Sequence, residues 1–217
     1  MKEIWLIRHA ESEANAGLRT TVPAEVALTP RGFAQSDFLA RAVTKTPAFI
    51  IVSPYLRAVQ TAEPLVKCFP NAPVSTWEIQ EFTYLALTNT RNSNSSERRP
   101  FTDAFWARNE PDYDDGEGAE SFADFWRRSQ TMVDKIRHEL PDNALIFCHG
   151  QLIRAALWQL LSSLEATPDV MSAFYSFLKA VRMPNASYIK ILVDQNGTDV
   201  FTGEIETAHL PSELITN

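Results

Sequence analysis

The sequence predicts an α/β fold, a three-layer α/β/α sandwich around a mostly parallel sheet with an antiparallel edge. Short apolar runs alternate with amphipathic helical patterns along most of the 217 residues, as in chains that link parallel strands through helices. Near the end of the chain, two strand-like runs flank Asn196-Gly197, a dipeptide that favours a tight hairpin. Apolar residues make up 45% of the chain, which is enough for one large core. We therefore expect a single domain over residues 1–217.

Three short apolar runs predict buried strands, at residues 4–7, 48–52 and 144–148. Their apolar residues follow one another without alternation, which is typical of strands covered by helices on both faces. Residues 74–77 predict a further short strand. The C-terminal hairpin is expected to pair residues 187–193 with 200–204.

Capping signals predict where the helices begin. Thr29 before Pro30 combines an N-cap side chain with a proline in the first helical position, and Ser53-Pro54 repeats that signal. Ser121 lies three residues before an acidic residue and opens an apolar stripe at helical spacing. The expected helices cover residues 30–43, 54–65, 121–140 and 151–161.

The segment from about 85 to 121 breaks the alternation of strands and helices. Its polar run, residues 89–96, is expected to be irregular, and residues 110–118 are acidic and rich in turn formers. Between them, residues 101–108 could form one short helix over a satellite core. Because its apolar content is too small for a core of its own, we interpret the segment as a lid or insertion.

The formal net charge of −7 argues against non-specific binding of this chain to nucleic acid or anionic membranes, which requires an overall positive charge. Cys68 and Cys148 lie beside apolar residues and are expected to be buried or half-buried thiols in a reducing compartment. No spacing of cysteine and histidine suggests zinc, and no apolar run suits a signal peptide or a membrane span. The sequence thus predicts a cytoplasmic protein without a bound metal.

Basic side chains follow the predicted strands at the points where they end. Arg8 and His9 follow the first strand, His149 follows the strand at 144–148, and Arg57 lies one turn into the helix after the second strand. Ligands bind beyond the carboxyl ends of strands in open α/β sheets, so we expect these four residues to meet in one crevice. Arginine forks bind phosphate oxygens, and histidine can be a nucleophile at neutral pH. The set favours phosphoryl transfer through a phosphohistidine over acyl transfer, because Cys148 has no evident base except the adjacent histidine.

Five sequence blocks in order resemble the histidine phosphatase superfamily, the phosphoglycerate-mutase-like proteins, and in particular its phosphatase branch. The resemblance covers nearly the whole chain, from Ile4 to about Val193. Ala10 departs from the family pattern, which has glycine there, and we expect its methyl group to narrow the pocket slightly. The blocks are residues 6–15, 28–35, 53–62, 77–81 and 147–150.

The resemblance implies a role for each matching residue, without any cofactor. His9 would attack phosphorus and become phosphorylated, and Glu81 would protonate the leaving oxygen, with Glu78 as the rival acid. Asn15 would add a neutral donor, and Thr21 is a weaker candidate for substrate contact. The phosphate pocket would be formed by Arg8, Arg57 and His149.

Alternatives remain open at this level. A mutase of the phosphoglycerate type would return the phosphoryl group to another hydroxyl, and a binding protein would only recognise phosphate. The expected partner is a small phosphorylated substrate, while the oligomeric state stays open. Within the insertion, Arg91, Arg98 and Arg99 are interpreted as solvated, unless Arg98 or Arg99 closes over a second anionic group of the substrate. His138 and His209 are expected at the surface, and Asn185 near the site.

Overall fold

The computed structural model describes residues 1–162, 164–194, 199–201 and 203–217. Its sheet has six strands in the order β3-β2-β4-β1-β5-β6. β1 is parallel to β4, and β2 is parallel to both β3 and β4, whereas β5 runs antiparallel to β1 and β6. The expected turn at Asn196-Gly197 lies outside the described residues. The strands are β1 (Lys2–Arg8), β2 (Phe49–Val52), β3 (Val74–Thr76), β4 (Ala144–Cys148), β5 (Tyr188–Val193) and β6 (Asp199–Phe201).

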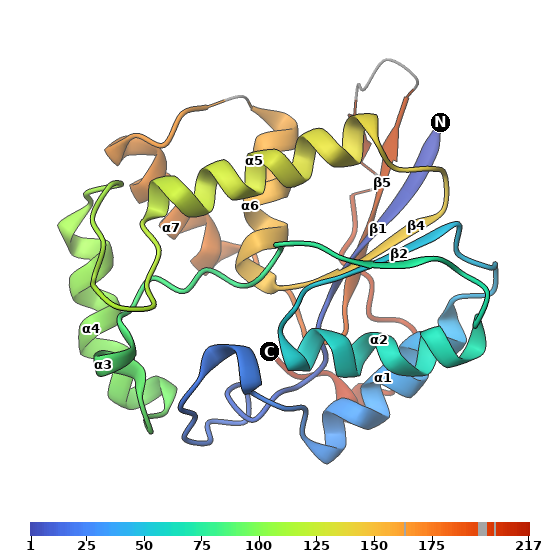
Figure 1. Cartoon of the computed structure of the whole chain (residues 1–217), viewed down its shortest axis with the longest axis horizontal. Helices are drawn as coiled ribbons and strands as arrows, with labels where there is room; N and C mark the ends of the chain where they lie inside the picture. The colour runs from blue at the N-terminus through green and yellow to red at the C-terminus, as the bar shows by residue number, and fades with distance from the viewer. Residues whose placement is uncertain (163, 195–198, 202) are drawn as a thin grey trace.

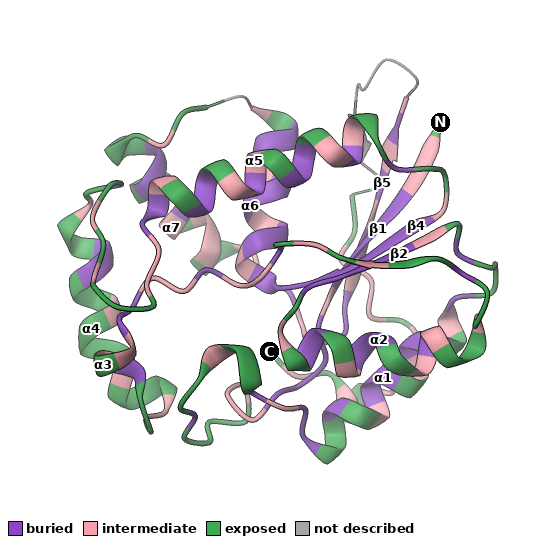
Figure 2. Cartoon of the chain, in the orientation of Figure 1, coloured by how far each residue is buried: buried purple, intermediate pink, exposed green. Residues whose placement is uncertain are grey.

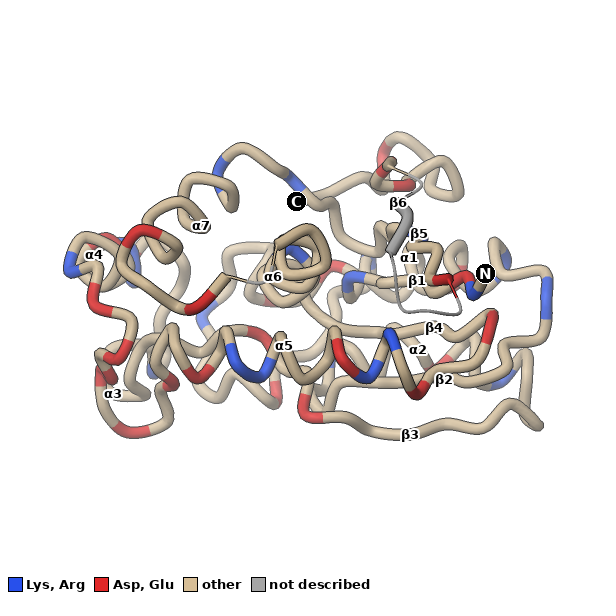
Figure 3. Tube along the Cα trace, turned by 90° about the horizontal axis from the view of Figure 1, so that it is seen from above, with Lys and Arg blue, Asp and Glu red and all other residues tan. Residues whose placement is uncertain are grey.

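Helices cover both faces of this sheet, with α1 and α2 on one side and α5 and α6 on the other (Figure 1). The predicted three-layer fold with an antiparallel edge is therefore confirmed. The outer side of α5 carries charges of both signs, as expected for a helix that buries only one stripe (Figure 3). The helices are α1 (Pro30–Ala42), α2 (Leu56–Cys68), α3 (Leu87–Thr90), α4 (Ser95–Arg108), α5 (Phe122–His138), α6 (Gly150–Leu161) and α7 (Pro168–Ala180).

The central strands are buried on both faces, which explains their continuous apolar runs (Figure 2). In β1, Ile4 and Leu6 belong to the core shared with α5 and α6. Trp5 and Ile7 point the other way, into the core shared with α1 and α2. The same strand thus holds both outer layers together.

The second helix begins later than its capping signal predicts. It starts at Leu56, after Tyr55, and no side chain caps its N-terminus. Ser53 cannot serve as the cap because its Oγ lies 2.7 Å from Nε2 of His149. A contact across 96 positions of the chain has replaced the local one. In contrast, Thr29 and Ser121 cap α1 and α5 as predicted.

The insertion is more regular than its polar sequence suggests. The run expected to be irregular contains α3 and the start of α4, where Asn94 and Glu97 form a reciprocal capping box. The short helix expected at residues 101–108 is the second half of α4. Its Phe105 and Trp106 join the main core instead of a satellite cluster. The helix α7, capped by Thr167, was not predicted at all.

Two other surface assignments need correction. Cys148 is buried as expected, but Cys68 is exposed at the end of α2. His209 is not a free surface residue: its ring stacks on Tyr188, and its Nε2 lies 3.1 Å from the carbonyl oxygen of Ala186. Among the described residues, no helix has the length and the apolar character needed to span a lipid bilayer.

Gly32 offers a test of how α1 docks onto the loop after β1. A Cβ at this position would lie 2.1 Å from the carbonyl oxygen of Glu11, which also accepts a hydrogen bond from the backbone of Thr29. Alanine usually stabilises a helix relative to glycine, but here we expect Gly32→Ala to lower the free energy of unfolding by about 1–3 kcal/mol. Urea denaturation measures this change. The exposed Asp37→Ala on the same helix is the control, with an expected change below about 0.5 kcal/mol; an equal effect of both variants would contradict the docking argument.

Candidate active site

The pairing of β1 with β4 brings the first two basic residues beside the last one. Arg8 is in register with Cys148, and the backbone N–H of His9 donates to the carbonyl oxygen of Cys148 at 2.9 Å. The rings of His9 and His149 consequently lie 5.1 Å apart between centroids. Arg57 reaches the same place from the first turn of α2, so four residues from three distant segments of the chain share one site.

His9 is held in one tautomer by its two contacts. Its Nδ1 lies 2.7 Å from the carbonyl oxygen of Ala10, an atom that can only accept. Arg57 donates through Nε to Nε2 of His9 at 3.2 Å. Since a guanidinium only donates, the proton belongs on Nδ1 and the lone pair on Nε2. Burial, with help from the charges of Arg57 and Arg8, holds the pKa of His9 well below its usual value. The ring is therefore neutral at neutral pH, with its lone pair on Nε2.

Arg57 is buried and Arg8 is half-buried, and both cations have incomplete hydrogen bonding. Arg8 donates to the carbonyl oxygen of Met183, and its buried Nε has no partner in the described part of the chain. Arg57 donates through Nη1 to the carbonyl oxygen of Pro23 at 2.7 Å. Burial lowers the pKa of each to about 10, so both stay charged at neutral pH. Buried charges with spare donors fit an anionic ligand.

His149 is fully buried behind the other three. Its Nε2 contacts the hydroxyl of Ser53, which in turn accepts from the backbone N–H of Tyr55 at 3.4 Å. The hydroxyl proton is then free to point at Nε2, which assigns the ring proton to Nδ1. That nitrogen is buried without a partner among the described residues. Burial and the charge of Arg57 hold the pKa of His149 well below its usual value.

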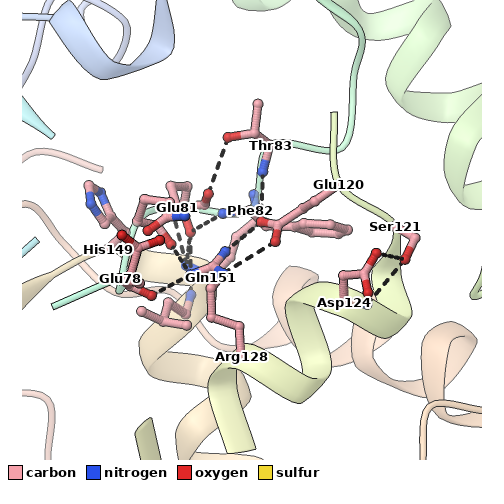
Figure 4. Close-up of polar contacts among 12 residues, drawn as sticks. Glu78, Glu81, Phe82, Thr83, Glu120, Ser121, Asp124, Arg128, His149 and Gln151 are labelled. Atoms are coloured by element: carbon pink, nitrogen blue, oxygen red, sulfur yellow. Dashed lines mark hydrogen bonds and ion pairs between the residues drawn. The ribbon is translucent and has the colours of Figure 1, made fainter. Parts of the chain in front are cut away.

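Glu81 lies at the N-terminus of α6, as Figure 4 shows. One carboxylate oxygen accepts from the backbone N–H groups of Gln151 at 3.1 Å and Leu152 at 3.3 Å. Helix N-termini stabilise such groups through their unpaired N–H donors. The backbone of α6 therefore fixes the carboxyl group beside His149, which immediately precedes this helix.

A half-buried ion pair supports the segment that carries Glu81. Arg128 on α5 pairs with Glu120 and also donates to the carbonyl oxygen of Gln80 at 2.8 Å. Glu120 accepts from the backbone N–H of Thr83. The two side chains thus hold the backbone on both sides of Glu81 (Figure 4).

A cavity of about 300 Å³ opens onto these groups. Several residues that line the cavity were not predicted from the sequence, among them Tyr55, Tyr84 and Gln151. Single aromatic and amide residues form no sequence pattern that indicates a binding site. His149 is fully buried and is not among the residues that line the cavity. The lining from the predicted set consists of Arg8, His9, Asn15, Arg57 and Glu81.

Asn15 is oriented so that its amide can donate. Its Oδ1 accepts from the hydroxyl of Ser12 at 2.8 Å and from Nδ2 of Asn185 at 3.0 Å. The Nδ2 group of Asn15 is therefore the end left for a ligand. Asn185, expected near the site, is buried against it.

Three expectations about nearby residues do not match the geometry. Thr21 is exposed and does not line the cavity, whereas its neighbour Thr20 does. Glu78, the rival acid, is exposed and lines a separate groove against α5. Ala10 does not narrow the cavity, because its methyl group packs with Leu28 and other apolar residues, and its φ is not positive.

Among the described residues, no group of three or more histidine, cysteine, aspartate or glutamate side chains is placed to hold a metal ion. The donor set of the site is instead rich in arginine, which repels cations and attracts oxyanions.

The buried histidines predict a loss of stability in mild acid. Both have a lowered pKa in the folded protein, so below their ordinary value of 6.5 the unfolded chain binds protons that the folded chain does not. We expect the free energy of unfolding to fall between pH 7.5 and pH 5.5. His9→Gln and His149→Gln should each reduce that fall by about 1 kcal/mol, as measured by urea denaturation at both pH values. An unchanged fall in both variants would show that other groups cause it.

Comparison with known proteins agrees with this geometry. A family model described as the histidine phosphatase superfamily (branch 1) matches residues 4–201. A protein of Hydrogenobacter thermophilus named "Putative phosphoserine phosphatase 2" is 28% identical over 156 residues, covering 71% of this chain and 76% of its own.

Solved structures share the fold across almost the whole chain. A phosphoserine phosphatase from Entamoeba histolytica, in complex with 3-phosphoglyceric acid, is 20% identical with a TM-score of 0.71, over 97% of this chain and 100% of that one. A mycobacterial glucosyl-3-phosphoglycerate phosphatase complexed with VO3 is 21% identical with a TM-score of 0.70, over 95% and 100%. The chain belongs to the histidine phosphatase superfamily, branch 1.

Proposed function

We propose that this protein hydrolyses small phosphomonoesters through a phosphohistidine formed on Nε2 of His9, without a metal ion. The observation that carries the proposal is the hydrogen bond from Arg57 to Nε2 of His9. The bond places the lone pair of a neutral imidazole on Nε2 beside a buried guanidinium, whose N–H would pass from Nε2 to a phosphoryl oxygen when the lone pair attacks phosphorus. A protein that only binds phosphate, without catalysis, would not need a His9 ring with its proton on Nδ1 and its lone pair on Nε2.

In the first step, Nε2 of His9 forms a bond to phosphorus as the ester P–O bond breaks. Arg8 and Arg57 face the equatorial oxygens, where negative charge is spread in the transition state. The Nδ1–H of His149 and the amide of Asn15 add neutral donors. Glu81, protonated, gives its proton to the leaving alkoxide.

In the second step, water attacks phosphorus and the phosphorus–nitrogen bond breaks. Glu81, now a carboxylate, takes a proton from that water, and inorganic phosphate leaves. His9 returns to its neutral form with the lone pair on Nε2. We further propose that residues 1–217 form one domain, in which the segment from about 85 to 121 acts as a lid over the site. We also propose that the protein works in the cytoplasm.

The nucleophile is tested with p-nitrophenyl phosphate in the presence of EDTA. We expect the wild type to keep its activity under chelation and His9→Ala to lose it by about 10³-fold or more, because His9 is the one imidazole that lines the cavity among the described residues. Quenching with SDS at alkaline pH, where phosphohistidine is stable, should trap label from ³²P-labelled substrate in the wild type alone. His138→Ala, at the exposed end of α5, is the matched control and should retain full activity. Undiminished activity of His9→Ala would refute the phosphohistidine.

The proton donor is tested by changing the leaving group. Glu81→Gln should lower kcat for an alkyl phosphate by about 10²–10⁴-fold, since an alkoxide needs a proton to leave. For p-nitrophenyl phosphate, whose phenolate leaves unprotonated, the loss in the first step should be much smaller, and phosphoenzyme should accumulate. Single-turnover kinetics on both substrates separates the two steps. Glu78→Gln is the control, and a larger loss there than at Glu81 would reverse the assignment.

A further inference from the structure

One wall of the cavity comes from the insertion and contains a cation that the proposed reaction does not use. Arg98, in the first turn of α4, lines the cavity together with Thr20 and Tyr84. It was expected to be a solvated loop residue. In the proposed reaction, the phosphoryl group is already bound by Arg8 at the end of β1 and Arg57 in the first turn of α2.

Neutral groups hold the guanidinium of Arg98 in place. Nε donates to the hydroxyl of Ser93 at 2.9 Å. Nη2 donates to the hydroxyl of Thr20 at 2.6 Å and to two backbone carbonyls. The third nitrogen, Nη1, has no hydrogen-bond partner in the described part of the chain. The side chain is therefore fixed in position with one pair of donors left over.

No carboxylate forms an ion pair with Arg98 among the residues that the structure describes, although the charge of Glu97 lies near it. Its neighbour Glu97 is turned toward Arg19 and the cap of α4. The next residue, Arg99, is 75% exposed and pairs with Asp103. Burial already lowers the pKa of Arg98. The cavity lining holds three arginines and Glu81 as its one acid, which is an excess of positive charge in a chain of net charge −7.

We propose that Nη1 of Arg98 binds a second anionic group of the substrate. The preferred substrates are then phosphomonoesters of small alcohols that also carry a carboxylate or a second phosphate. This inference rests on the proposed phosphatase function of the same cavity, and a cavity of about 300 Å³ has room for a small alcohol of this kind. Arg98 is a specificity residue in this scheme and takes no part in the chemistry at phosphorus.

The test compares esters that differ only in the second charge. One pair is 3-phosphoglycerate and glycerol 3-phosphate, in which a carboxylate is replaced by a hydroxymethyl group. The other pair is propane-1,3-diol bisphosphate and 3-hydroxypropyl phosphate. Release of inorganic phosphate gives kcat and KM for the wild type, Arg98→Met, Arg98→Lys and the control Arg99→Met.

We expect the wild type to prefer the charged member of at least one pair by about 10-fold or more in kcat/KM, as for one charge-assisted hydrogen bond. The pair that shows the preference identifies the second group as carboxylate or phosphate. Arg98→Met should bring the ratio close to one, mainly through KM, and Arg98→Lys should retain part of it. Arg99→Met should keep the wild-type ratio. The readout is the ratio of kcat/KM for the two members of a pair. Damage to the loop around Thr20 that lowers both values equally leaves this ratio unchanged.

Two results would overturn the inference while leaving the proposed function intact. One is a wild type that hydrolyses both members of each pair equally well. The other is a preference that survives in a folded Arg98→Met protein. Failure of the wild type to hydrolyse any of the four esters would also overturn the inference, and the proposed function fails with it only where p-nitrophenyl phosphate is not hydrolysed either.

Discussion

The parallel pairing of β1 with β4 is the constraint on which the site depends. It sets the backbone of His9 against Cys148, so the residues that follow the two strands emerge side by side at the carboxyl edge. A shift of one residue would turn His9 or His149 to the opposite face. That register is fixed by burial on both faces, because each strand sends alternate side chains into two different cores. The chemistry at the edge is thus set by packing in the middle of the sheet.

The same burial determines the electrostatics of the site. Two guanidinium groups and two imidazoles are enclosed together, and desolvation lowers the pKa of all four. The arginines remain charged because their pKa stays near 10, whereas the histidines become neutral. Neutrality is what a nucleophile and a buried donor need, and the retained charges are what a phosphate needs. A site of this kind is destabilising when empty, since its charges and several of its donors have no partners.

Most of the fold could be predicted from the sequence because its signals are local. Thr29 and Ser121 cap the helices that follow them, and continuous apolar runs mark strands with two covered faces. The predictions failed where a distant residue competed for the same atoms. Ser53 has the sequence of a cap but contacts His149, and Thr20 lines the cavity in place of Thr21 because its backbone pairs with Ser93 across 73 positions. Ala10 fits because its backbone does not adopt the conformation that would require glycine.

The insertion shows why the catalytic end of the site was easier to predict than the substrate end. The groups proposed to bind and attack phosphate, Arg8, His9, Arg57 and His149, sit at strand ends and a helix start, so their positions follow from topology. The walls around Arg98 depend instead on how the loop after β1 meets α4, through the bridge between Thr20 and Ser93 and the contacts of Arg19 with Asn92 and Glu97. These contacts join two polar segments that have no apolar periodicity, so no pattern in the sequence predicts them. Because Arg98 is one of the groups that hold this junction, a substrate bound to its free nitrogen, as proposed above, would contact both the insertion and the loop after β1.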